Sequence, residues 1–218
     1  MNSPLKMIAI IGMALVTQID EARSQTIDLK SSTLSVLTAA EREPFLDAHN
    51  KARKEVEVAP VEWSEELGQE ALESLRQQKE ALVEAAKEHW NEGRAVLRKH
   101  RTDTKHGENV AGWVGGRNVS AASAVGLWLR EKAAFDKLDA KAPYRVGDEE
   151  GQSETDASGN ERPVIVGHYT AVVWKTTTQI GAAKLSFELK DDRGTTRTYT
   201  ALVCVYNPPG NRRGERPY

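Results

Sequence analysis

A single cysteine, Cys204, occurs in the 218 residues of the chain, and this scarcity excludes any disulfide bond within it. Proteins exported to oxidising compartments often carry paired cysteines. Cys204 lies inside the apolar run "TALVCVYN", where a cysteine ordinarily packs as a small buried hydrophobic side chain. We therefore expect an inert thiol and a fold that packing alone holds together.

The chain also lacks an excess of either charge and a long hydrophobic run. Its 30 Lys and Arg residues face 32 Asp and Glu residues, which leaves a formal net charge of −2 and no basic stripe. We therefore expect no nucleic-acid partner. The apolar run at residues 7–16 is shorter than the roughly 20 residues that cross a bilayer, so we expect no membrane span in the mature chain.

Familiar catalytic motifs are missing as well. There is no GxSxG nucleophile elbow, and the glycine-rich "GWVGG" at residues 112–116 lacks the Lys and Ser or Thr of a phosphate-binding loop. Cys204 has no local activating signature. These absences make a binding protein a better expectation than an enzyme.

The N-terminus has the pattern of a secretory signal peptide. Lys6 precedes the apolar run, and Ala22 and Ser24 have the small-x-small spacing of a cleavage site, so residues 1–24 are predicted to be removed. Asp20 and Glu21 are unusual so close to a cleavage site, and an uncleaved N-terminal anchor is the alternative. We expect a secreted or periplasmic protein with a short lead at residues 25–41 and one domain at 42–218.

Helical patterns dominate the first two thirds of the domain. Thr38 and Glu41 form a capping-box pattern before a first helix that ends ahead of Pro60. Ser64 is a suitable N-cap for one long helix or two abutting ones, which Gly93 interrupts. We expect a loop at residues 101–116 and a third helix at 118–138.

Strand patterns dominate the last third. The β-branched and alternating segments at residues 169–175, 182–190 and 196–207 are predicted strands, the last two joined in a hairpin by "DDRG". Helices followed by an antiparallel sheet indicate an α+β domain. Residues 140–164 have no apolar periodicity, and we predict a flexible insertion there, with a functional lid as the alternative.

Four side chains at the edges of predicted elements suit a metal ion: His100, Glu108, Glu131 and His168. Imidazole nitrogens and carboxylate oxygens are both ligands of divalent cations such as Zn²⁺. These four residues are spread over a long stretch of chain, so their spacing does not establish a site, and His106 is an equally acceptable ligand.

Four ordered motifs carry a resemblance to a known family. They are "HNKAR" at residues 49–53, "GENVAG" at 107–112, "GHYTAVVWKTTTQIG" at 167–181 and "VCVYNPPGNRRGERPY" at 203–218. Together they resemble the signatures of the cysteine-rich secretory, antigen 5 and pathogenesis-related proteins, the SCP/TAPS superfamily. The resemblance implies an α-β-α sandwich with a central antiparallel sheet between helical layers.

The resemblance also implies a central cavity shared by His168, Glu108, Glu131 and His100, with His106 as the alternative to His100. Trp174 is expected on the strand face of His168, as a core residue. The remaining motif residues are expected to be structural, through hydrogen bonds and turns: His49, Asn50, Asn207, Gly210 and Asn211.

This chain differs from the family in lacking the cysteines that form disulfides. Members often carry a cysteine after the glycine of "IG", where this chain has Ala182 and Ala183, so Cys204 is left alone. This departure favours a bacterial envelope protein over a venom or cysteine-rich animal protein.

The expected function is that of a secreted, non-enzymatic binding module. Its His/Glu cavity would hold Zn²⁺ or another divalent cation, and a groove would bind a lipid or protein partner. The alternative is a metal-dependent hydrolase, in which a zinc-bound water attacks with Glu131 or Glu108 as general base. A third reading is a satisfied polar cluster that meets no metal, since the fold does not determine activity.

Overall fold

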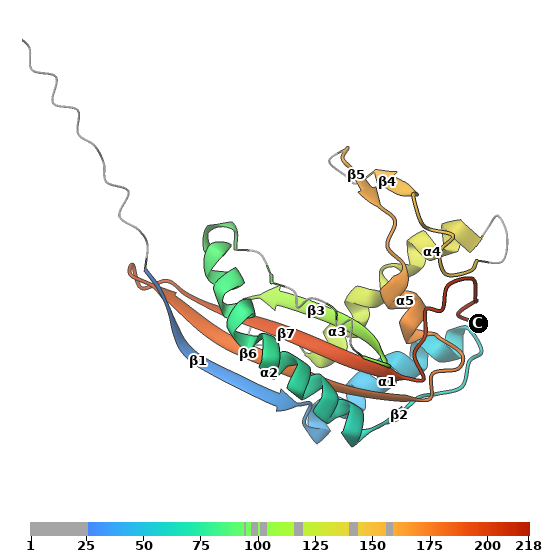
Figure 1. The fold of residues 1–218 in the computed structure, drawn as a ribbon, viewed down its shortest axis with the longest axis horizontal. Coiled ribbons are helices and arrows are strands. Elements are labelled where there is room, and N and C mark those ends of the chain that lie inside the picture. The colour runs from blue at the N-terminus through green and yellow to red at the C-terminus, as the bar shows by residue number, and fades with distance from the viewer. Residues whose placement is uncertain are drawn as a thin grey trace, which may run out of the picture.

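A central sheet with helices on both faces forms the body of the protein (Figure 1). The computed structural model describes residues 26–93, 95–96, 100, 104–115, 120–139, 144–155 and 159–218. The predicted signal peptide, residues 1–24, lies outside the described residues and stays a prediction. None of the described helices is both long and apolar enough to cross a membrane.

The sheet has the strand order β1-β6-β7-β3, and all of these neighbours are antiparallel. A short fifth strand, β2, pairs in parallel with the start of β6. The strands are β1 (Ile27–Val36), β2 (Glu62–Trp63), β3 (Gly107–Val114), β6 (Gln179–Asp191) and β7 (Thr196–Asn207). The predicted hairpin is confirmed: Asp191 Oδ1 accepts from the N–H groups of Arg193 and Thr195, and Gly194 takes a φ of 87°.

Each face of the sheet carries its own hydrophobic core. On one side the alternating residues Leu185, Phe187 and Leu189 of β6 pack beneath α2 (Glu65–Glu88). On the other side Ala182, Cys204 and their neighbours pack against the remaining helices. These helices are α1 (Ala39–Glu55), α3 (Ala121–Leu129), α4 (Lys132–Asp139) and α5 (Gly167–Val172). The predicted α-β-α layering is confirmed.

The long helix α2 lies close to the sheet because Gly181 of β6 has no side chain to separate it from the backbone of α2. A Cβ on Gly181 of β6 would lie 2.2 Å from the backbone nitrogen of Gly68 in α2. At its N-terminus, Ser64 Oγ accepts from the N–H of Leu67 at 3.3 Å, as its capping pattern predicts. The helix is single, and a short 3₁₀ turn, η1 (Trp90–Glu92), leads to Gly93 at a φ of 59°.

Buried polar groups bind the first helix to the rest of the domain. Arg53 is fully buried and donates to the carbonyl oxygens of Ala59, Val172, Trp174 and Thr177 at 2.7 to 3.0 Å. Three of these carbonyls belong to α5 and the turn after it, so Arg53 anchors that segment. Burial lowers the pKa of its guanidinium from 12.5 to about 10.

Three secondary-structure predictions were wrong. Residues 107–114 form the edge strand β3 rather than a loop, because pairing with β7 outweighs the low strand propensity of Gly107 and Gly112. The third helix is two helices, α3 and α4, with a turn at Arg130 and Glu131.

The third error concerns residues 169–175, which do not form a strand. His168 and the residues after it form α5, and Trp174 follows the helix, so the shared strand face predicted for His168 and Trp174 does not exist. Trp174 is nevertheless fully buried, as expected of a core residue.

Within residues 140–164 the structure describes a short two-stranded sheet, β4 (Ser153–Thr155) paired with β5 (Glu161–Pro163). In Figure 1 this pair projects from the body of the molecule beyond α4 and α5. All six of its residues are exposed. The flexibility expected of this segment stays a prediction.

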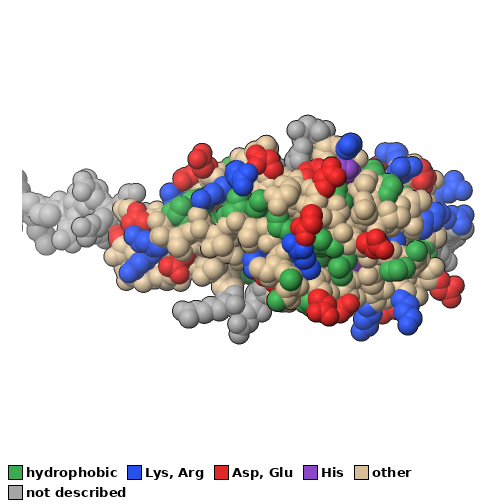
Figure 2. Space-filling model, turned by 90° about the horizontal axis from the view of Figure 1, so that it is seen from below, with side chains coloured by type: hydrophobic (Ala, Val, Ile, Leu, Met, Phe, Trp, Pro, Cys, Tyr) green, Lys and Arg blue, Asp and Glu red, His purple; other side chains and the backbone are tan. Residues whose placement is uncertain are grey.

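The charge distribution agrees with the absence of a basic stripe in the sequence. On the face drawn in Figure 2, acidic and basic side chains are interspersed.

Candidate functional site

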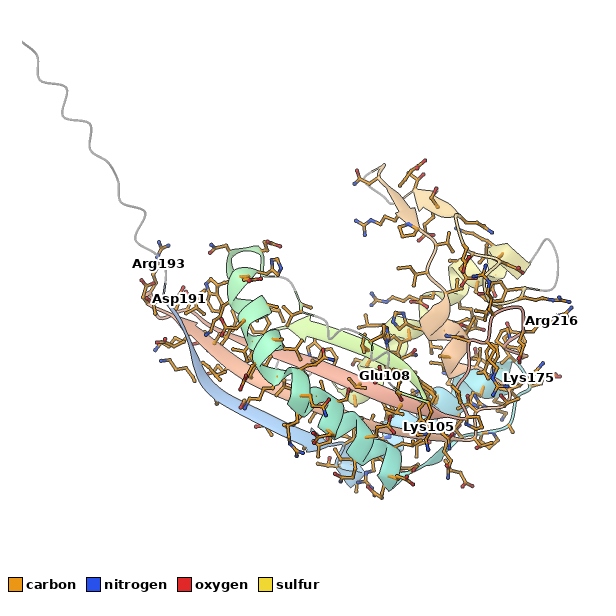
Figure 3. The ribbon with its side chains drawn as sticks, in the orientation of Figure 1. Lys105, Glu108, Lys175, Asp191, Arg193 and Arg216 are labelled. Carbon is orange, nitrogen blue, oxygen red and sulfur yellow. The ribbon has the colours of Figure 1, made fainter. Side chains whose placement is uncertain are left out.

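The candidate site lies beside the edge strand β3, where four separate elements meet. Glu108 is on β3 (Figure 3), Glu131 is in the turn between α3 and α4, and His168 is in the first turn of α5. His100 comes from the connection between η1 and β3.

Glu131 holds His168 through a short hydrogen bond. Nδ1 of His168 lies 2.5 Å from Oε1 of Glu131, and Oε2 accepts from the backbone N–H groups of His168 and Tyr169 at 2.9 and 3.0 Å. Because an ionised carboxylate is only an acceptor, this contact places the ring proton on Nδ1. In the neutral ring Nε2 of His168 then carries the lone pair, as in a metal-binding histidine that a carboxylate orients.

The other two predicted residues form a looser pair. Nδ1 of His100 lies 3.8 Å from Oε2 of Glu108, which is longer than a hydrogen bond. The Glu108 side chain is only 3% exposed, whereas that of His100 is 53% exposed. The rings of His100 and His168 are 6.4 Å apart between centroids, so the four residues form a row from Glu108 to Glu131.

The imidazole and carboxylate groups of the row are suitable zinc ligands, but they are arranged as two separate pairs. Among the described residues, no group of three or more His, Cys, Asp and Glu side chains converges closely enough to hold a metal ion. A cation would therefore require the side chain of His100 to move, and its exposure leaves room for such a movement.

His106, the alternative to His100 in the sequence, does not belong to this row. Its Nδ1 lies 2.7 Å from Oε2 of Glu70, a residue of α2. The structure therefore favours His100 as the histidine that accompanies His168.

Two supporting residues were missed as parts of the site. Asn109 donates from Nδ2 to the carbonyl oxygen of His168 and to the hydroxyl of Tyr206, at 3.0 and 3.1 Å. The indole of Trp128 stacks parallel to the His168 ring at 6.4 Å, with an interplanar angle of 8°. Asn109 directly follows Glu108 in "GENVAG", so the motif itself contained a signal for it.

The structural residues expected from the first motif behave as predicted. His49 donates from Nδ1 to the carbonyl oxygen of Phe45 at 2.9 Å and accepts at Nε2 from the Tyr206 hydroxyl at 3.1 Å. Asn50 exchanges two hydrogen bonds with the backbone of Val61. Burial lowers the pKa of His49 to about 4, with a further contribution from the charge of Arg53.

Of the C-terminal motif residues expected in turns, Gly210 and Asn211 lie in the irregular segment after β7, whereas Asn207 is the last residue of β7 and pairs with Gln179. Asn211 has a φ of 53°, and its side chain bonds to Thr170 and to the carbonyl oxygen of Gly167. A Cβ on Gly210 would lie 2.7 Å from the Trp174 ring. Cys204 is fully buried, and burial raises the pKa of its thiol, which agrees with an inert residue.

Comparison with known sequences gives plant relatives. The chain is 33% identical to the STS14 protein of Solanum tuberosum over 175 residues, which is 80% of this chain and 64% of that protein. It is 31% identical to a pathogenesis-related protein PR-1 type of Sambucus nigra over 174 residues, 80% of each chain. These relatives give no support to the bacterial origin suggested by the missing disulfides.

Among solved structures, Na-ASP-1 is similar at a TM-score of 0.53 and 19% identity, over 84% of this chain and 42% of that one. The crystal structure of NaASP2 with Zn²⁺ has a TM-score of 0.47 and 19% identity, over 84% and 86% of the two chains. The first similarity supports the fold alone.

The match to a family model assigns this chain to a family. The model of the cysteine-rich secretory protein family, CAP, matches residues 46–206, which include the whole row from His100 to His168 and three of the helices around it. The chain therefore belongs to the cysteine-rich secretory protein family.

Proposed function

We propose that this chain is a secreted, non-enzymatic CAP module that binds a divalent cation, with Zn²⁺ the best fit, between His168 and His100. The observation that carries the proposal is the short contact of Glu131 with Nδ1 of His168, which leaves the Nε2 lone pair available beside a second imidazole. Glu108 would supply an oxygen ligand or a compensating charge.

The same contacts argue against catalysis. Glu131 accepts three hydrogen bonds from His168 and Tyr169, so its oxygens are occupied in holding α5. A general base has to reach the proton that it removes. Glu108 is almost completely buried. Neither carboxylate is therefore well placed to serve as a general base.

A metal-dependent hydrolase remains the second candidate, because the Glu131 and His168 pair is also a catalytic arrangement of carboxylate and imidazole. Bound Zn²⁺ would supply an acidified water. Glu131→Gln should abolish any turnover while the protein stays folded by circular dichroism. Turnover that persists in this variant contradicts Glu131 as the base.

A groove next to the site is the proposed binding surface for a lipid or protein partner. It has a volume of about 420 Å³ and borders Glu131. Its walls combine aliphatic, basic and acidic side chains, from Arg130, Ala133, Ala134, Lys137, Glu154, Arg162, Pro163 and Ile165 in addition to Glu131. Ile165 is 55% exposed, which is unusual for a large aliphatic side chain and supports a partner at this place.

Calorimetric titration of the chain with Zn²⁺ at pH 7.5 and pH 5.5 tests the cation site. Binding should weaken at pH 5.5, because protons compete with the metal for imidazole nitrogens, and it should disappear in His168→Ala. His89→Ala is the matched control, since His89 is a partly exposed histidine at the end of α2 that bonds to Glu92 at 3.0 Å and is not one of the four residues of the row. Absence of binding to the unaltered chain would leave the row as a structural polar cluster.

A fluorescent fatty acid serves as the probe of the groove. Ile165→Glu should weaken its binding, whereas Leu127→Glu changes an exposed leucine that does not line the groove and should leave binding unchanged. Failure of the unaltered chain to bind the probe would refute a lipid of this class and leave the protein partner.

A further inference from the structure

A second cavity lies next to the start of α2. Its volume is about 330 Å³, and it is separate from the row of His100 to His168. One apolar residue, Leu67, lines it together with six polar ones: Ser64, Glu66, Lys105, His106, Gln179 and Asn207. So polar a lining is suited to a ligand that forms hydrogen bonds.

The strand register explains why these residues meet. Gln179 and Asn207 are directly paired, at the start of β6 and the end of β7. Gly107 pairs with Tyr206, so Lys105 and His106 arrive beside the same end of β7. The first turn of α2 covers this end of the sheet, and Figure 3 shows Lys105 near it.

His106 is a preoriented hydrogen-bond acceptor. Its side chain is only 9% exposed, and its Nδ1 lies 2.7 Å from Oε2 of Glu70, whose other oxygen accepts from the Thr104 hydroxyl at 3.0 Å. In the neutral ring the carboxylate places the proton on Nδ1 and leaves a lone pair on Nε2, which has no hydrogen-bond partner among the described residues. Glu70 does not line the cavity, so the Nε2 edge of the ring is the one that faces it.

The other polar side chains of the cavity are also available. Glu66, Lys105, Gln179 and Asn207 have side chains without a hydrogen-bond or ion-pair partner in the part of the chain that the structure describes. One cation and one anion therefore face the same small space. Charged and amide side chains without a protein partner either stay hydrated or bind a ligand whose polar groups replace the water.

We propose that this cavity binds a small zwitterion of the α-amino acid class. Three acceptors, on Glu66, His106 and Asn207, match the three N–H donors of an ammonium group. Donors on Lys105, Gln179 and Ser64 match a carboxylate.

Other ligand charges match the cavity less well. A simple anion would face the carboxylate of Glu66, and a simple cation would face Lys105. A neutral polyol would leave the charges of Glu66 and Lys105 without a counter-charge. This site needs no metal and is independent of the cation site proposed above.

Calorimetric titration of the chain with alanine tests the proposal, and three related compounds remove one feature each. N-acetylalanine lacks the ammonium group, alaninamide lacks the carboxylate, and glucose is a neutral polyol of comparable size. Alanine should bind at least about tenfold more tightly than any of these, since a hydrogen bond to a charged group contributes about that factor or more.

Two substitutions assign the ends of the ligand. Lys105→Met should weaken alanine binding about tenfold and leave alaninamide binding unchanged, because the amide lacks the charge that Lys105 recognises. His106→Leu should weaken the binding of both, and His89→Leu is its control, from a surface His–Glu pair outside the cavity. Lys105 is exposed, so its substitution tests the site even where His106→Leu disturbs folding.

Two results would overturn the proposal. One is equal or tighter binding of glucose or N-acetylalanine than of alanine, which would show that the charges do not select the ligand. The other is no heat of binding with alanine at millimolar concentration in a chain that is folded by circular dichroism.

Discussion

Acidification should destabilise the fold through His49, a residue that lies outside both proposed sites. The ring is fully buried and neutral, with Nδ1–H bonded to Phe45 and Nε2 accepting from Tyr206. Burial holds its pKa near 4, whereas an unfolded histidine titrates near 6.5. The unfolded chain therefore binds a proton in a pH range where the folded chain does not.

The sign and size of the effect follow from this difference. A base whose folded pKa is lowered contributes its full stability above pH 6.5 and loses it as the pH falls towards 4. Each unit of difference corresponds to about 1.4 kcal/mol, so the complete loss is about 3 kcal/mol and the loss between pH 7 and pH 4.5 is about 2 kcal/mol.

Urea unfolding at pH 7 and pH 4.5 measures this loss, and comparison with His49→Gln separates it from the titration of carboxylates. The variant is expected to be less stable at pH 7 and to lose about 2 kcal/mol less than the unaltered chain on acidification. His89→Gln should retain the pH dependence of the unaltered chain. Equal losses in the unaltered chain and in His49→Gln would refute the reasoning.

Three further substitutions, one of them with a matched control, test the packing. Arg53→Met should lower the free energy of unfolding by about 3 kcal/mol or more, measured by urea denaturation, because it leaves four carbonyls without their donor. Gly181→Ala should lower the free energy of unfolding by about 3 kcal/mol, because the added methyl group clashes with α2. Its control, Gly126→Ala, has open space around it inside α3 and should raise the free energy of unfolding by about 0.5–1 kcal/mol. Equal effects of the two substitutions would contradict the close approach of α2 to the sheet. Ala182→Cys should form a disulfide with Cys204, its direct partner across β6 and β7, and add about 3 kcal/mol; two titratable thiols after oxidation would contradict this register.

Local patterns were sufficient for the parts of the fold in which neighbours in sequence decide the structure. The capping residues Thr38 and Ser64 and the alternation in β6 and β7 predicted the first two helices and the hairpin. The edge strand β3 and the helix α5 were missed because distant partners determine them. Pairing with β7 forms β3, and the carbonyls bound by Arg53 hold the segment after His168.

The same limit applies to the candidate site. A motif contains His168, and the family resemblance implied Glu131, but their contact joins residues 37 positions apart. It depends on α5 being a helix whose first turn receives the carboxylate. The choice between His100 and His106 depended on Glu70, which lies on α2 and in none of the motifs. Side-chain partners of this kind become visible only when the helices are placed on the sheet.

The start of β3 links the proposed cation site with the acid-sensitive core. Side chains alternate along a strand, so Glu108 and Asn109 face opposite sides of the sheet. Glu108 belongs to the row of His100 and His168, whereas Asn109 joins the carbonyl of His168 to Tyr206 and, through it, to His49. Protonation of folded His49 as the pH approaches 4 removes the acceptor of the Tyr206 hydroxyl, so acid should loosen the backbone of His168. Between pH 7 and pH 4 the amide of His168 should lose more of its protection against hydrogen exchange than the amides of β6, and equal losses would contradict this coupling.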